Sequence, residues 1–325
     1  MVGSHLADLL MQQTDWTIYG LCRWRSPLDN VEHLLEYANR KERLHFLYAD
    51  LTDYISLAEA MDKARPDYVF HLAAHSFPKT SFDVPIETFN TNINGTFNLL
   101  EAIRRTKGID PVIHVCSSSE VFGRVPKEKL PINEDCSFHP ASPYAISKTA
   151  TDLVGRFFAE AYGMKTVVTR MFTHTGPRRG DVFAESTFAK QIAMIEAGLI
   201  EPVLKTGNLD SLRTWADVRD AVRAYHLLVT VNPQPGQCYN IGGTFTCTVR
   251  AMLDQLLAYS QVPNIKVVTD PDRLRPIDAD LQVPDTRKFT QHTGWKPEYD
   301  FPTTMLDLLN YWRARIKGGR SFLSR

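Results

Sequence analysis

Tyr144 and Lys148 are the two residues whose types and spacing most directly suggest chemistry. They lie four positions apart, which places both side chains on one face of a helix. A lysine ammonium beside a phenol favours the phenolate and lowers the phenol's pKa from about 10. Tyr144 is therefore a candidate acid–base group near neutral pH. The pair alone is weak support, because a tyrosine and a lysine at this spacing usually belong to the solvated face of an amphipathic helix.

A polar segment upstream of this helix strengthens the prediction. The residues Ser117–Glu120 read Ser-Ser-Ser-Glu and directly follow the apolar run Pro111–Cys116, which is typical of a buried strand. Ligands of an open parallel sheet bind beyond the carboxyl ends of its strands. We therefore expect this segment and the Tyr144 helix to form one site.

Strand-like and helical patterns alternate along the chain. We predict strands at residues 17–22, 44–49, 68–74, 111–116, 166–171 and 238–241, and helices at residues 56–64, 90–105 and 144–162. The run 68–74 is almost wholly apolar, as expected of a strand that is covered on both faces. This alternation predicts an α/β fold with a doubly wound parallel sheet.

The start of the chain lacks part of the expected pattern. A dinucleotide-binding sheet begins with a strand, a glycine-rich turn and a helix. Here Gly3 fits the third glycine, and residues 1–12 form the helix, with Ser4 as a candidate cap. The central strand and the first two glycines are missing. We favour a start assigned too late over a chain that binds its cofactor poorly, because the later motifs are intact; a plain N-terminal helix is the third reading.

Composition narrows the class of protein. The chain has 325 residues, 43% of them apolar, and its 37 basic residues balance 37 acidic ones. This balance predicts no nucleic-acid or membrane partner. No apolar run approaches the roughly 20 residues that span a bilayer, and no signal peptide is recognisable. The five cysteines form no Cys-x-x-Cys pair, which predicts reduced thiols, a cytoplasmic protein and no metal site.

Taken together, the motifs resemble those of the extended short-chain dehydrogenases/reductases, and within them the GDP-mannose 4,6-dehydratases and the related 4-keto reductases. The resemblance runs from Gly3 to Trp295. It implies a Rossmann domain of residues 1–172 and 213–246, and a smaller discontinuous α/β substrate domain of residues 173–212 and 247–325. The matching segments are Ser118–Gly123, Ser142–Tyr144 with Lys148, Gly176–Gly180, Gly207–Arg213, Arg275-Pro276 and Gly294–Pro297.

The resemblance implies a dehydratase mechanism. Tyr144 takes the proton of the sugar C4 hydroxyl, Lys148 holds the phenolate and a ribose hydroxyl, and Ser118 bonds the sugar oxygen. Glu120 then removes the C5 proton and protonates the departing C6 hydroxyl. A structural role for Glu120, such as capping the next element, stays open. So do a 4-keto reductase, a 4-epimerase and, from another class, a catalytically silent sugar-nucleotide or NADP-binding protein.

NADP is the expected cofactor, because no acidic residue ends the strand 17–22, where Arg23 and Arg25 follow. The resemblance assigns the cofactor contacts to Gly3, Arg23, Asp50, Leu51, Ala73, Ala74, Tyr144, Lys148 and His174.

The expected partner is a nucleotide-diphosphate sugar. The resemblance assigns its contacts to His75, Ser119, Thr173, Arg179, Lys190, Arg213 and Arg275, with Arg178 as a further cation for the diphosphate. Thr173 stands where the family usually has Asn, so it lacks the second function of an amide. The family also predicts a homodimer through the helices 90–105 and 144–162, or a homotetramer that uses residues 23–25.

Overall fold

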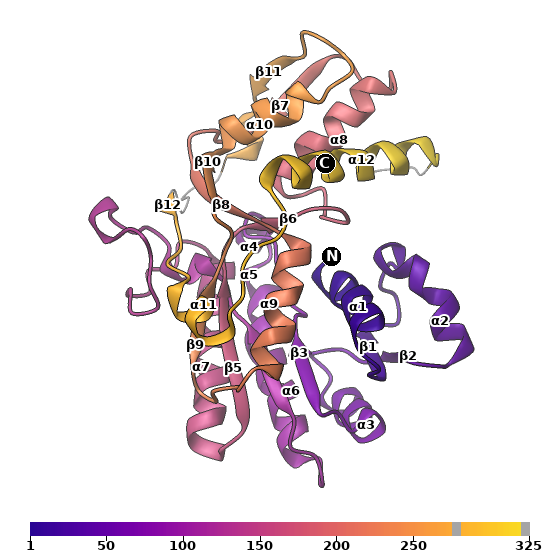
Figure 1. Ribbon diagram of the computed structural model, residues 1–325, viewed down its shortest axis with the longest axis vertical. Helices are drawn as coiled ribbons and strands as arrows, with labels where there is room; N and C mark the ends of the chain where they lie inside the picture. Colours follow the sequence, from indigo (N-terminus) through magenta and orange to yellow (C-terminus); the bar gives the residue numbers. More distant parts are fainter. Residues whose placement is uncertain (275–280, 320–325) are drawn as a thin grey trace.

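The computed structural model describes residues 1–274 and 281–319. Its main sheet is parallel, with the strand order β3-β4-β5-β9 (Figure 1). These strands are β3 (Tyr68–His71), β4 (Val112–Cys116), β5 (Lys165–Met171) and β9 (Cys238–Ile241). Each lies within a residue or a few of its predicted range, which confirms the α/β class.

Helices cover both faces of this sheet because its strands are apolar on both sides. Val167 packs among residues of one face and Val168 among those of the other, as alternation along a strand requires. One face is covered by α3 (Tyr54–Ala64), α6 (Gly95–Arg105) and α7 (Pro143–Tyr162), and the other by α9 (Val218–Thr230) and α11 (Arg287–Thr293).

The predicted helix 90–105 is interrupted at its start. Residues Asn90–Asn94 form a π-helical turn between α5 (Pro85–Phe89) and α6. Such turns are rare, and they are frequent at functional sites. The short helix α4 (Thr80–Asp83) precedes α5, and the π-helical turn lies against α7, the helix that carries Tyr144.

A second, two-stranded parallel sheet stands apart from the first. It pairs β1 (Ile18–Cys22) with β2 (Leu44–Tyr48), and within the described residues no strand joins β1 to β3. The helix α1 (Val2–Gln13) packs on α9 through Leu6, Leu9 and Leu10, which confirms the predicted N-terminal helix. Met1, not Ser4, is its N-cap residue, because Ser4 already lies inside the helix and donates to the Met1 carbonyl oxygen.

The remaining chain forms a smaller α/β unit above the main sheet (Figure 1). Phe188, Ile192, Met252 and Leu308 lie in its core and are almost fully buried. Its elements are α8 (Ala184–Glu196), β7 (Val203–Thr206), α10 (Val249–Ala258), β11 (Lys266–Thr269) and α12 (Phe301–Lys317). A further sheet joins β10 (Phe245–Thr248), β8 (Leu212–Asp217) and β12 (Leu281–Gln282), with β6 (His174–Thr175) also paired to β8. Strand β8 thus belongs to this sheet, although the predicted boundary at 213 assigns most of it to the first domain.

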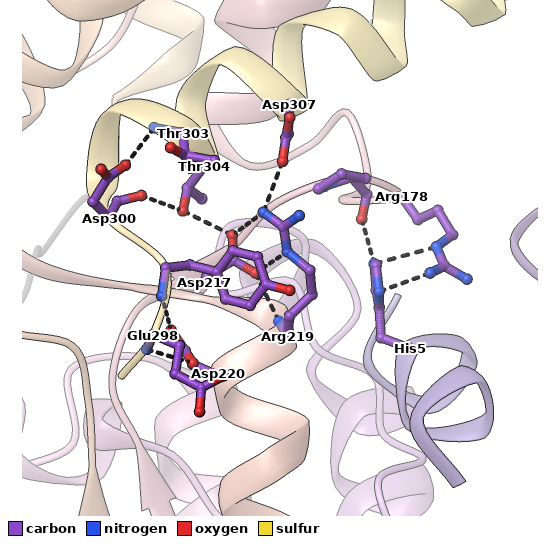
Figure 2. A network of polar contacts seen from close by, with 12 residues as sticks. His5, Arg178, Asp217, Arg219, Asp220, Glu298, Asp300, Thr303, Thr304 and Asp307 are labelled. Atoms are coloured by element: carbon purple, nitrogen blue, oxygen red, sulfur yellow. Dashed lines mark hydrogen bonds and ion pairs between the residues drawn. The ribbon is translucent and has the colours of Figure 1, made fainter. Parts of the chain in front are cut away.

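Asp217 connects the two units. Its carboxylate accepts hydrogen bonds from Arg219 Nη2 and from Thr304 Oγ1, both at 2.7 Å, and Arg219 also pairs with Asp307 at 2.8 Å (Figure 2). These contacts tie the end of β8 and the start of α9 to α12. The remaining short elements are α2 (Leu35–Arg40) and the 3₁₀ turns η1 (Asp29–Leu34), η3 (Ser119–Phe122), η4 (Lys127–Lys129) and η5 (Pro271–Arg273).

Within the described residues, no helix combines the length and apolar character that a bilayer span needs. All five cysteines are free thiols.

Candidate active site

The helix α7 presents Tyr144 and Lys148 to the interior. The Ser142 hydroxyl accepts a hydrogen bond from the Ala145 amide at 3.0 Å, and Pro143 occupies the first turn, so both capping rules fix the start of the helix. The Tyr144 amide donates to the Ser81 hydroxyl at 3.0 Å. Tyr144 and Lys148 are only 9% and 5% exposed, which rules out the surface role that their spacing alone left open.

The pKa of Tyr144 contradicts one prediction. Burial raises the pKa of the phenol above its usual value, and Glu120 also raises it, while the Ser118 hydroxyl and Arg179 act in the opposite direction. The expectation that Lys148 lowers this pKa is wrong for this structure. The Lys148 ammonium donates instead to the carbonyl oxygen of Cys116 at the end of β4, and burial lowers its own pKa.

The turn after β4 places Ser118 and Glu120 beside Tyr144. The Ser117 amide donates to the Thr169 carbonyl oxygen at 2.7 Å, which continues the pairing of β4 with β5. The Ser118 hydroxyl then accepts from the Glu120 amide at 3.2 Å and caps the turn η3. The Ser118 hydroxyl lowers and the Glu120 carboxylate raises the pKa of the Tyr144 phenol, so these three predicted residues interact in this structure.

A buried hydrogen-bond network that the sequence did not reveal supports this site. The Asn92 side chain accepts from the His75 amide at 2.7 Å and donates to the His75 carbonyl oxygen at 3.0 Å. It also donates to the Ser147 hydroxyl at 2.8 Å, which donates in turn to the Tyr144 carbonyl oxygen at 2.7 Å. Asn92 is 1% exposed and lies in the π-helical turn. In the sequence, the only signal was a polar asparagine within the predicted helix 90–105.

Arg179 lies beside the phenol with its own counter-ion. Its Nε donates to Glu185 at 3.1 Å, and its guanidinium lies 3.3 Å from the centre of the Phe183 ring. Tyr144 and Arg179 each act on the pKa of the other. His174 lies nearby: burial, followed by Arg179, lowers its pKa to about 3, so its imidazole is neutral near pH 7.

Arg178 faces away from this cluster, although it is the next residue. Its guanidinium binds His5 Nδ1 on α1 at 2.7 Å (Figure 2). It also binds Asp8 Oδ2, on the same helix, at 2.5 Å. It also contacts His33 of η1 at 3.3 Å. Arg178 therefore binds residues of α1 in this structure, whereas the sequence suggested that it binds the diphosphate.

The other predicted substrate contacts are spread over the second unit. Lys190 on α8 pairs with Asp181 at 2.9 Å. Arg213 lies on β8, opposite Cys247 on one side and Gln282 on the other. Thr173 precedes β6, and its carbonyl oxygen accepts from the Ala216 amide at 2.9 Å. Ser119 lies buried in η3. Arg275 lies outside the described residues.

The predicted cofactor contacts gather at the carboxyl ends of the parallel strands. Arg23 follows β1, Asp50 and Leu51 follow β2, and Ala73 and Ala74 follow β3. The pKa of Asp50 is lowered, first by its hydrogen bond from the Thr52 amide and also by the charge of Arg23. Gly3 lies in α1.

A pocket of about 180 Å³ lies elsewhere, beside Asp217. Trp215, Phe245, Tyr299 and Phe301 are among the residues that line it. None of the predicted site residues does, so this pocket is separate from the Tyr144 cluster.

Comparison with known proteins supports the sequence resemblance. The sequence profile of the family described as GDP-mannose 4,6 dehydratase matches residues 1–308. The chain is 30% identical to the GDP-mannose 4,6-dehydratase of Sinorhizobium fredii, covering 98% of this chain and 95% of that protein. It is 32% identical to the GDP-6-deoxy-D-mannose reductase of Pseudomonas aeruginosa over 78% of this chain and 82% of the relative. The structure of RMD from P. aeruginosa complexed with NADPH is similar with a TM-score of 0.77 and 30% identity, covering 87% of this chain and 95% of that one.

Proposed function

Because the chain belongs to the GDP-mannose 4,6-dehydratase family of extended short-chain dehydrogenases/reductases, we propose that it is a nucleotide-sugar 4,6-dehydratase acting on GDP-mannose. One observation carries this proposal: Glu120 lies in the turn η3 directly after β4, where its amide donates to the Ser118 hydroxyl at 3.2 Å and its carboxylate acts on the Tyr144 phenol. A 4-epimerase oxidises and reduces C4 only, so it needs no carboxylate there. A dehydratase needs a second acid–base group for C5 and C6.

The residues then act in order. Tyr144 accepts the proton of the C4 hydroxyl in its phenolate form, while the Ser118 hydroxyl holds the same oxygen. Because burial raises the pKa of the phenol, the phenol must first lose its proton for this step. The resulting C4 ketone acidifies the C5 proton, which Glu120 removes. Glu120 then returns that proton to the C6 hydroxyl as it leaves as water. Hydride return to C6 is accompanied by protonation of C5, and the proton that Tyr144 took from the C4 hydroxyl balances this uptake. The Lys148 ammonium supplies a positive charge one turn after Tyr144 on α7. Its expected partner is a ribose hydroxyl of the cofactor.

NADP is the cofactor that fits these residues. When bound, NADP would supply the hydride acceptor for C4 and then the hydride donor for C6, so no external reductant would be consumed. Arg23 at the end of β1 offers a charge-assisted fork for a 2′-phosphate, and no acidic side chain occupies that strand end. The similar P. aeruginosa structure is a complex with NADPH, which supports the same choice.

We assign cofactor binding to residues 1–172 and 213–246, and sugar-nucleotide binding to residues 173–212 and 247–325. His75, Ser119, Thr173, Arg179, Lys190, Arg213 and Arg275 are the proposed substrate contacts. The support for two of them is their place and charge: Lys190 is buried on α8, and Arg179 acts on the pKa of the Tyr144 phenol.

A 4-keto-6-deoxysugar reductase is the second candidate. Its support is the P. aeruginosa reductase, which is 32% identical to this chain. The raised pKa of Tyr144 also suits a reductase, because a protonated phenol donates its proton to a C4 carbonyl.

We further propose a cytoplasmic homodimer or homotetramer. The free thiols support a reducing compartment. Exposed apolar side chains on α6 and α7, Phe97, Ile146, Leu153 and Phe157, support a dimer through these helices.

One assay separates the candidates. The protein is incubated with GDP-mannose and a catalytic amount of NADP⁺, and the 4-keto product is detected by its absorbance in alkali. A dehydratase forms this product with no net NADPH. A reductase leaves GDP-mannose unchanged and consumes NADPH in proportion to added 4-keto sugar. A silent binding protein does neither, and either of the last two results would refute the proposal.

A further inference from the structure

Arg170 is a buried charge that none of the proposed steps uses. It lies on β5 and is 2% exposed. Its Nε donates to Asp152 Oδ2 at 2.8 Å, and its Nη2 donates to Asp152 Oδ1 at 3.2 Å. Asp152 is fully buried on α7, one turn after Lys148. The guanidinium therefore holds the helix that carries Tyr144 and Lys148 through a two-point contact.

The same guanidinium contacts the turn that carries Glu120. Its central carbon lies 5.4 Å from the centre of the Phe122 ring, within the range of a cation–π interaction. Phe122 is fully buried and is the last residue of η3, two positions after Glu120. Arg170 thus reaches both halves of the proposed acid–base machinery.

Arg170 also binds the segment that connects these halves. Its Nη1 donates to the Glu134 carbonyl oxygen at 2.7 Å, and its guanidinium lies 4.7 Å from the centre of the Phe138 ring. The Glu134 carboxylate accepts from the Asn240 amide on β9 at 2.8 Å, which anchors the segment to the main sheet. Helix α7, the turn η3 and the segment that connects them must keep their spacing, and all three contact the Arg170 side chain.

Stability alone does not explain such a group. Removing an arginine and an aspartate from water is costly, and well-packed apolar residues in their place are often equally stabilising. A planar fork with fixed directions does what apolar packing does poorly, because it sets both distance and orientation. A misplacement of about 1 Å in an active site can slow a reaction about a hundredfold.

We propose that Arg170 is a positioning residue that sets the separation between Glu120 and the Tyr144–Lys148 pair. Its role is to keep removal of the C5 proton in step with oxidation at C4. The proposal rests on the dehydratase function. The two contacts of Arg170 lie on different elements. Phe122 belongs to η3, the turn that carries Glu120, whereas Asp152 belongs to α7, the helix that carries Tyr144, and it also raises the pKa of Lys148.

The test is a single-turnover experiment with GDP-mannose and NADP⁺, followed by the absorbance of reduced nicotinamide and by quenched samples for 4-keto-6-deoxy product. We expect Arg170→Lys and Phe122→Leu to slow elimination by about 10–100-fold. Oxidation at C4 stays within about threefold of wild type, so reduced cofactor builds up during the turnover. Phe122→Tyr keeps the aromatic ring and is expected to keep the wild-type ratio of the elimination rate to the C4 oxidation rate. Asp152→Asn is expected to slow both steps.

Arg313→Lys is the matched control. Arg313 makes a similar two-point pair with Glu196, at 2.7 Å for both bonds, between α12 and α8 in the second unit. This variant is expected to lower the melting temperature and leave the ratio of the two rates unchanged. If Arg170→Lys does not fold, Phe122→Leu decides the question.

Two results overturn the inference in distinguishable ways. An unchanged rate ratio in Arg170→Lys and Phe122→Leu, in a background where the wild type makes the 4-keto product, refutes the positioning role alone. A wild type that makes no 4-keto product refutes the dehydratase function and the positioning role with it.

Discussion

A Cβ atom on Gly123 would overlap the carbonyl oxygen of His139, so only glycine fits between η3 and the segment that leads to α7. Gly123 also has a φ of +55°, which other residues rarely adopt. The turn that carries Glu120 is therefore held against the approach to Tyr144 by a backbone contact.

Gly123→Ala should displace this turn. We expect dehydratase activity to fall by at least about tenfold and the protein to lose stability, because both backbone strain and steric overlap oppose the native turn. Gly198→Ala is the control: its φ is +68°, yet nothing lies within 4 Å of its Cβ position. Alanine there carries only the backbone strain, about 1–3 kcal/mol. Equal activity losses in the two variants would show that the overlap does not matter.

Glu120→Gln should abolish release of the 4-keto product, because an amide cannot take the C5 proton. Slow oxidation at C4 should remain, since Tyr144, Ser118 and Lys148 are intact. Product analysis and the absorbance of reduced nicotinamide report the two steps separately. Full turnover by Glu120→Gln would remove Glu120 from the mechanism.

Ser118→Ala should shift the pH–rate profile. The Ser118 hydroxyl lowers the pKa of the Tyr144 phenol, so its loss raises that pKa further. Because C4 oxidation requires Tyr144 as a base, the rising limb of kcat should move to higher pH, with a loss of about 10–100-fold near neutral pH. Ser118→Thr keeps the hydroxyl and should keep the profile. A profile in Ser118→Ala that only drops in height, without moving, would contradict this role.

The apolar face of α7 should govern assembly. Leu153 and Phe157 are 49% and 46% exposed. The double variant Leu153→Arg/Phe157→Arg should therefore yield monomers in light scattering coupled to gel filtration, because two charges cannot be buried unpaired in an interface. Leu199→Arg, at a 62% exposed position of the second unit, should leave the oligomer intact. Monomeric wild-type protein would refute the homo-oligomer proposal.

Stability should fall as the pH falls below about 6.5. Burial lowers the pKa of His71 and of His114 to about 3, and burial together with Arg178 lowers that of His5 to about 4. The unfolded chain binds these protons near pH 6.5 and the folded chain does not, so the stabilisation is complete above 6.5 and is lost towards pH 4.

Urea unfolding at a series of pH values measures this slope. His114→Gln removes one titrating group and should flatten the curve between pH 6.5 and pH 4. A free energy of unfolding that stays constant over this range would contradict the buried, neutral state of these histidines.

The sequence by itself determined the α/β class, the strands of the main sheet and the helix that carries Tyr144 and Lys148. Local patterns encode these features, because burial on both faces of a parallel sheet demands apolar runs and a helix places residues four apart on one face. The cluster of Ser118, Glu120 and Tyr144 was also predictable, since the carboxyl ends of strands share one edge of the sheet.

Only the tertiary structure decided which partner each polar group has. Arg178 and Arg179 are neighbours in sequence, yet one binds Asp8 on α1 and the other lies beside Tyr144. Lys148 reaches the carbonyl oxygen of Cys116, and burial, not the lysine, dominates the pKa of Tyr144. Asp152 and Arg170 meet across 18 positions of sequence. Such pairings and the depth of burial depend on how distant segments pack, which no local pattern records.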